Sequence, residues 1–177
     1  MKASDTITDF LTGREIPNIG AEMNRQAIEQ FLVNNKGFDK KDLLIDHKIS
    51  LMINGEIYRS TVDIIVAVEE NKMMVIKCAA GSLGSRERET LAVARLIEEY
   101  QVPYSIVSDG KTAIILDTIA GKKTGEGLDA IPSKEESLKR IQQIPLQSFP
   151  PEKKEREKLI FRSYDSMIIN VPDKNRI

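Results

Sequence analysis

Two neighbouring segments, TVDIIVAV at residues 61–68 and MMVIKCAA at residues 73–80, limit the possible folds more than any other feature of the chain. Each is rich in apolar residues and has the length of a β-strand, and a short polar turn separates them. Because the apolar residues continue without alternating, both faces of each strand must be covered. We therefore expect two central strands of a sheet with helices on both faces, which is an α/β fold.

The remaining elements follow from hydrophobic periodicity and turn signals. Residues 18–35 place apolar side chains on one helical face, and Gly37 follows as a stop signal. Asn54-Gly55 and Asp109-Gly110 each mark a tight hairpin between two strand patterns. In chain order, the sequence predicts a helix at 18–35, strands at 43–53, 57–69 and 73–80, a helix at 86–99, and strands at 104–108 and 112–117.

Composition divides the chain into three parts. Residues 1–16 are polar and aperiodic, which predicts a flexible N-terminal arm, and residues 17–131 hold the α/β domain. Residues 132–177 predict a helical C-terminal extension, in which a capping box formed by Ser133 and Glu136 opens a short helix. A proline-containing linker and a charged helix from about residue 152 follow. A loop is expected around Gly121, Gly125 and Gly127.

Several classes of protein are excluded by what the chain lacks. It has no run of about 18 apolar residues, which argues against a membrane span, and its first residues have no apolar signal segment. One cysteine, Cys78, allows no internal disulfide and fits a cytoplasmic location. With a single histidine as well, a zinc site is excluded, so any metal would be a hard cation held by carboxylates. A net charge of −1 gives no overall basic footprint for nucleic acid.

Two charges, Asp63 and Lys77, interrupt the central apolar strands. Burial of an unpaired charge costs several kcal/mol, so each must find a partner. Side chains on adjacent strands lie about 5 Å apart, which makes these two natural partners. The pair fits a structural ion pair, and it also fits a site of metal-assisted hydrolysis, in which the carboxylate holds Mg²⁺ and the lysine contacts the phosphate.

The segments RSTVDIIVAVEENKMMVIKCAAG and YQVPYSIVSDGKTAIILD resemble the N-terminal domain of type I restriction R subunits, in the PD-(D/E)XK nuclease superfamily. The resemblance extends from about Ala21 to Thr118. It implies an αβββαβ restriction-endonuclease-like core, with a mixed central sheet flanked by helices. It also implies DNA as substrate, Mg²⁺ or Mn²⁺ as cofactor, and a partner subunit of a restriction system.

The resemblance further implies which residues would form a site. Asp63 aligns with the metal-binding aspartate of the family, and the Glu-x-Lys motif falls on Lys77-Cys78-Ala79, so a lysine replaces the glutamate. A rearranged site would take its missing carboxylate from a helix, where Glu22, Glu87 and Glu89 are the candidates and Glu89 is favoured over Glu87. The expected catalytic residues are therefore Asp63, Lys77 and Glu89, and the expected metal ligands are Asp63, Glu22 and Glu89.

Arg86, Arg88 and Arg95, on the helix after the second central strand, are candidates for contacts with a nucleic-acid backbone. Three functions stay open. The first is a metal-dependent endodeoxyribonuclease with a rearranged site. The second is a catalytically inactive nuclease fold that binds nucleic acid or protein, and the third is a homodimer scaffold joined by the charged C-terminal helix. A helix carboxylate close enough to Asp63 to share one cation would favour the enzyme.

Overall fold

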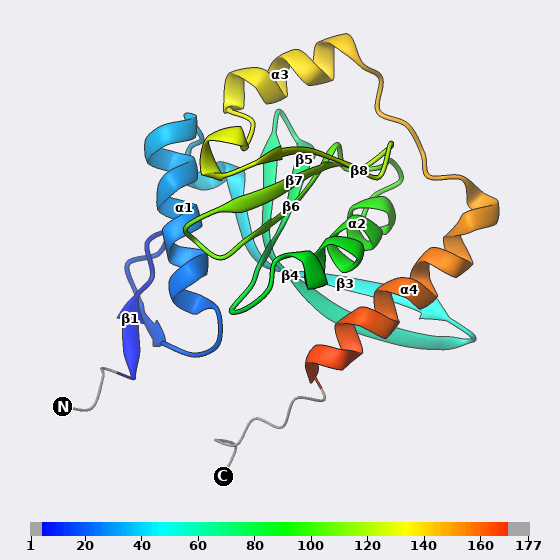
Figure 1. The fold of residues 1–177 in the computed structure, drawn as a ribbon, viewed down its shortest axis with the longest axis horizontal. Coiled ribbons are helices and arrows are strands. Elements are labelled where there is room, and N and C mark those ends of the chain that lie inside the picture. Colours follow the sequence, from blue (N-terminus) through cyan, green and yellow to red (C-terminus); the bar gives the residue numbers. More distant parts are fainter. Residues whose placement is uncertain (1–4, 170–177) are drawn as a thin grey trace.

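A computed structural model describes residues 5–169 of the chain. Its centre is a six-stranded mixed sheet in the order β3-β4-β5-β6-β7-β8, in which β5 and β6 run parallel and the other neighbours antiparallel (Figure 1). The strands are β3 (Leu43–Ile53), β4 (Glu56–Val68), β5 (Asn71–Cys78), β6 (Tyr104–Ser108), β7 (Ala113–Asp117) and β8 (Lys122–Glu126). The main helices are α1 (Glu22–Lys36), α2 (Glu87–Leu96), α3 (Lys134–Gln143) and α4 (Pro151–Ile169). The mixed α/β class predicted from the sequence is confirmed.

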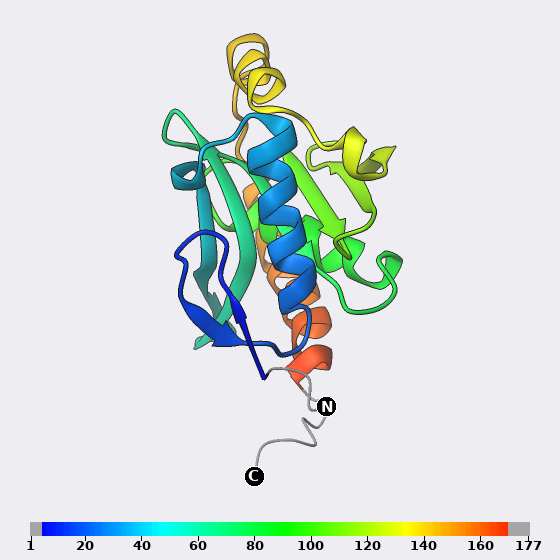
Figure 2. The same ribbon diagram turned by 90° about the vertical axis from the view of Figure 1, so that its left-hand side faces the viewer.

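Helices cover both faces of the central strands, as the uninterrupted apolar runs predict. Figure 2 shows α1 in front of the sheet, with α4 behind it. Consecutive strand residues point to opposite faces. Ile64 and Ile76 therefore join the core under α1, whereas Ile65 and Val75 join the core under α2. All four are fully buried, so β4 and β5 are the central strands of the domain.

The C-terminal helix packs onto the α/β domain. Phe161 of α4 is 1% exposed and belongs to the same core as α2, and its ring meets that of Tyr58 edge-on at 6.1 Å between centroids. The preceding α3 begins at the predicted capping box, where Ser133 and Glu136 exchange hydrogen bonds. Within residues 5–169, no helix combines the length and the apolar character that a membrane span requires.

The structure differs from the expected flexible arm in the part that it describes. Residues 6–17 contain a small antiparallel hairpin, β1 (Thr6–Thr8) with β2 (Glu15–Pro17), and residues 1–4 lie outside the described residues. Asp9 accepts a hydrogen bond from the side chain of Gln26 on α1 at 2.9 Å, and the backbone N–H of Phe10 donates to the same side chain at 2.7 Å. Hydrophobic periodicity could not reveal this segment, because polar contacts to α1 hold it together with Leu11, which packs against the core.

The glycine-rich segment after β7, expected as a loop, forms the edge strand β8. Gly125 pairs with Ile115, and a Cβ at position 125 would lie 2.8 Å from the Cβ of Ala130. Glycine is therefore required here by close packing rather than by a turn. The helix α2 also ends at Leu96, three residues before the predicted end.

Candidate functional site

The candidate site lies where β4 extends past β5. The strand β4 pairs with β3 along its length, from Glu56 to Val66, but it pairs with β5 from Ile64 to Val68. The first half of β4 therefore has one open edge. Asp63 and Lys77 lie at the point where the two strands separate.

Lys77 points toward α2 and forms an ion pair with Glu89. The distance from Lys77 Nζ to Glu89 Oε1 is 3.2 Å, and Nζ also donates to the backbone oxygen of Thr61 at 3.5 Å. Glu89 is fully buried, and the Lys77 side chain is 13% exposed. Burial alone would lower the pKa of Lys77, but the carboxylates of Asp63 and Glu89 raise it above its usual value, so the ammonium stays charged. Burial raises the pKa of Glu89, and Lys77 opposes that rise.

The partner of Lys77 is thus Glu89 rather than Asp63, which differs from the ion pair expected across the two strands. Asp63 Oδ2 accepts a hydrogen bond from the backbone N–H of Cys78 at 2.6 Å. The separation of β4 from β5 explains this contact. The N–H of Cys78 lies beyond the last residue of β5 that pairs with β4, so it needs another acceptor.

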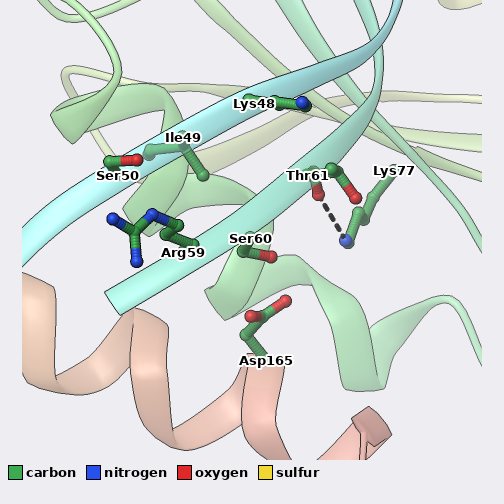
Figure 3. Close-up of a pocket in the computed structure, with 8 residues that line it drawn as sticks. All are labelled: Lys48, Ile49, Ser50, Arg59, Ser60, Thr61, Lys77 and Asp165. Carbon is green, nitrogen blue, oxygen red and sulfur yellow. Dashed lines mark hydrogen bonds between the residues drawn. The ribbon is translucent and has the colours of Figure 1, made fainter. Parts of the chain in front are cut away.

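A pocket of about 580 Å³ opens at the free edge of β4 (Figure 3). It is lined by Lys48, Ile49, Ser50, Arg59, Ser60, Thr61, Lys77 and Asp165. The side chains of Lys48 and Arg59 are exposed, and neither forms an ion pair or a hydrogen bond with any residue in the described part of the chain. Sequence reasoning did not select these two cations. The sequence offered one signal for them, since both are polar residues at alternating strand positions. That pattern is equally typical of strand residues that merely face solvent.

A second charged cluster lies under α1, around the buried Arg25. The guanidinium binds Glu22 through a short contact and Glu29 at 2.6 Å, and it lies 3.7 Å from Asp9. Burial raises the pKa of the fully buried Glu29 to about 7, although Arg25 opposes the shift. The polar face of α1 is therefore an internal ion cluster. It lies on the opposite face of the sheet from Glu89, because α1 and α2 cover opposite faces.

A family model described as the N terminus of the type I restriction enzyme R protein matches residues 20–132. The chain belongs to this family. The match covers well over half of the chain and extends from the start of α1 past β8, which confirms the resemblance seen in the sequence. The β1–β2 hairpin, α3 and α4 lie outside it. No curated protein and no solved structure shows significant similarity to the chain.

In this member of the restriction R-protein family, the side chains near Asp63 do not fit a divalent metal. Mg²⁺ requires several oxygen ligands that converge on one point. Glu22 and Glu89 lie on opposite faces of the sheet, and each already faces a protein cation, Arg25 or Lys77. Among residues 5–169, no group of three or more His, Cys, Asp or Glu side chains is arranged to hold a metal.

The three arginines proposed for nucleic-acid contacts all take part in ion pairs within this domain. Arg88 donates two hydrogen bonds to Glu157 of α4, at 2.6 and 2.8 Å, and Arg95 donates a third at 3.1 Å. Arg86 lies 3.3 Å from Glu89. Arg88 and Arg95 thus join α2 to α4, a role that no local pattern could predict because Glu157 is distant in the sequence.

Proposed function

We propose that this domain binds DNA without hydrolysing it and serves a type I restriction system as a DNA-binding module. The observation that carries the proposal is a pair of cations, Lys48 and Arg59, that line the same pocket as Lys77 and have no side-chain partner among residues 5–169. The domain would contact the sugar–phosphate backbone along the open edge of β4.

The composition of the pocket supports phosphate binding. Lys, Arg, Ser and Thr side chains make most protein contacts to DNA phosphates. In the β3–β4 hairpin, Lys48 lies opposite Thr61 and Ser50 lies opposite Arg59, so cations and hydroxyls alternate across the two strands. The family name supports DNA as the ligand, since restriction enzymes act on DNA.

The charge arrangement around Lys77 supports binding without cleavage. Metal-assisted phosphodiester hydrolysis needs a cation that neutralises the phosphate and carboxylates that hold this cation. Here a lysine, Lys77, replaces the glutamate of related domains. Its ammonium group forms an ion pair with the Glu89 carboxylate. Asp63 is engaged by the backbone N–H of Cys78. The positive charge at this site is thus the ammonium group of Lys77 rather than a metal ion held by carboxylates.

The proposal is tested with a labelled DNA duplex titrated by fluorescence anisotropy at several salt concentrations. The double variant Lys48→Glu/Arg59→Glu should bind more weakly than wild type. The slope of log K against log salt concentration should also be less negative by about 1.8, because each of the two lost phosphate contacts accounts for about 0.9 of that slope. Lys111→Glu is the matched control, since Lys111 is exposed and lies in the β6–β7 turn, away from the pocket. Equal affinity of the double variant and this control would refute the assignment of the pocket.

A parallel assay measures cleavage of supercoiled plasmid with Mg²⁺ or Mn²⁺. We expect uncut plasmid with wild type, and binding that EDTA does not change. Metal-dependent cleavage by wild type that disappears in Asp63→Asn and Lys77→Met would instead establish the endonuclease with a rearranged site.

A further inference from the structure

A second pocket, of about 540 Å³, lies between α2, the linker after α3 and the first turns of α4. Most of its lining comes from residues outside the part of the chain that matches the restriction R-protein family. The charged residues that line it are Arg88, Arg95, Lys153, Arg156 and Glu157. Four cations and one carboxylate give this lining a net charge of +3.

The carboxylate of Glu157 cannot balance the two arginines that bind it. Arg88 contacts both of its oxygens, and Arg95 contacts one. Burial favours a higher pKa for Glu157, but the hydrogen bonds from Arg88 and Arg95 hold the pKa below its usual range, so the group is ionised. One negative charge thus faces two guanidinium groups. Within the described part of the chain, one positive charge therefore remains uncompensated, at a site where the Arg95 side chain is only 14% exposed.

Lys153 and Arg156 add two further cations at the rim of this pocket. Both are exposed, and neither has an ion-pair partner among residues 5–169. Apolar and neutral polar groups complete the wall. Phe149 lies under the Arg95 guanidinium at 5.3 Å, and Gln101 and Ser148 line the same wall.

We infer that this pocket binds a small phosphate-bearing anion of about nucleotide size. Pockets of roughly 300–1,000 Å³ with an apolar wall and a few polar groups are typical of small-molecule sites. Guanidinium groups donate paired hydrogen bonds that match phosphate oxygens, and a doubly charged phosphate would neutralise more of the excess charge than a carboxylate would. The inference rests on this pocket alone and is independent of the proposed DNA contacts at β4.

Isothermal titration of the full chain with inorganic pyrophosphate and with adenosine monophosphate tests the inference, and sodium sulfate at equal ionic strength serves as the anion control. We expect saturable binding of the phosphate compounds. The double variant Lys153→Glu/Arg156→Glu should weaken that binding by about tenfold or more, since reversing two cations changes the net charge of the lining from +3 to −1. Neither side chain has an ion-pair partner within the described residues, so the variant should fold. Lys154→Glu, on the same helix turn but outside the pocket lining, should bind like wild type.

Equal binding by wild type and Lys153→Glu/Arg156→Glu would overturn the inference, as would the absence of binding by either phosphate compound. A second titration, with a short DNA duplex, distinguishes this site from the proposed DNA site. If the variant loses affinity for a short DNA duplex while pyrophosphate does not bind to wild type, the pocket belongs to a nucleic-acid surface and the inference fails. Lys48→Glu/Arg59→Glu should leave pyrophosphate binding unchanged, whatever it does to DNA binding.

Discussion

Replacing Lys77 with methionine removes the cation that faces Glu89 between β5 and α2. Methionine keeps an unbranched apolar side chain of similar length, so packing should change little. Glu89 is fully buried. After the change, the cation that remains paired with it among the described residues is Arg86, at 3.3 Å and with a side chain that is 28% exposed. The substitution therefore leaves a buried carboxylate that is poorly compensated.

Breaking a buried ion pair in this way costs about 3–5 kcal/mol of unfolding free energy, and the remaining Arg86 contact favours the lower end. For a domain of this length, about 2–4 °C of unfolding temperature is lost per kcal/mol, so we expect a decrease of roughly 6–20 °C. The loss should depend on pH. Burial already raises the pKa of Glu89, and removal of Lys77 raises it further. The folded variant then binds a proton that the unfolded chain releases, so its stability rises as the pH falls.

The assay is urea unfolding followed by circular dichroism at pH 8 and at pH 5. Lys77→Met should be clearly less stable than wild type at pH 8 and closer to it at pH 5, and Lys77→Met/Glu89→Leu should recover much of the loss. Lys72→Met is the control, because its partner Glu98 is 27% exposed and such pairs contribute at most about 1 kcal/mol. A wild-type midpoint for Lys77→Met at pH 8, or a deficit that is the same at both pH values, would refute the reasoning.

Three further predictions concern the buried Glu29, the contact of Arg88 with Glu157, and the response of the domain to Mg²⁺. Glu29 has a folded pKa of about 7 against an ordinary value of 4.5, so wild-type stability should fall as the pH rises through that interval, and Glu29→Gln should flatten this dependence in urea midpoints. Arg88→Ala leaves Glu157 with Arg95 as its remaining arginine, which should cost about 1–3 kcal/mol and speed amide hydrogen exchange in α4 but not in the central strands. Millimolar Mg²⁺ should leave the unfolding temperature of wild type unchanged in differential scanning fluorimetry, and a clear rise would contradict the misfit of the carboxylates.

The secondary structure and the centre of the sheet could be predicted because they depend on neighbouring residues. The apolar runs at 61–68 and 73–80 require cover on both faces wherever they lie, and the structure provides it with α1 and α2. Asn54 and Gly55 both have positive φ angles, as a tight hairpin turn between twisted strands demands. The β1–β2 hairpin and β8 were missed, because backbone pairing and hydrogen bonds to α1 hold them rather than an apolar pattern of their own.

The sequence also determined that Asp63 and Lys77 need partners, since a charge within an apolar strand is costly wherever the chain folds. It did not determine which partners. Glu89 reaches Lys77 because α2 packs across β5, whereas Asp63 turns to the N–H of Cys78 because β4 separates from β5. Both outcomes depend on the relative position of elements rather than on local pattern.

Both pockets were decided by tertiary structure alone. Lys48 and Arg59 are ordinary polar strand residues until β4 extends past β5 and leaves an open edge with Lys77 beneath it. Arg88 joins α2 to α4 only because α4 packs against α2 and brings Glu157 within 2.6 Å of it. Local preferences are set by the few residues that share a turn or a strand. The position of α4 is set by burial of side chains such as Phe161 against residues far away in the chain, and sequence spacing does not encode that geometry.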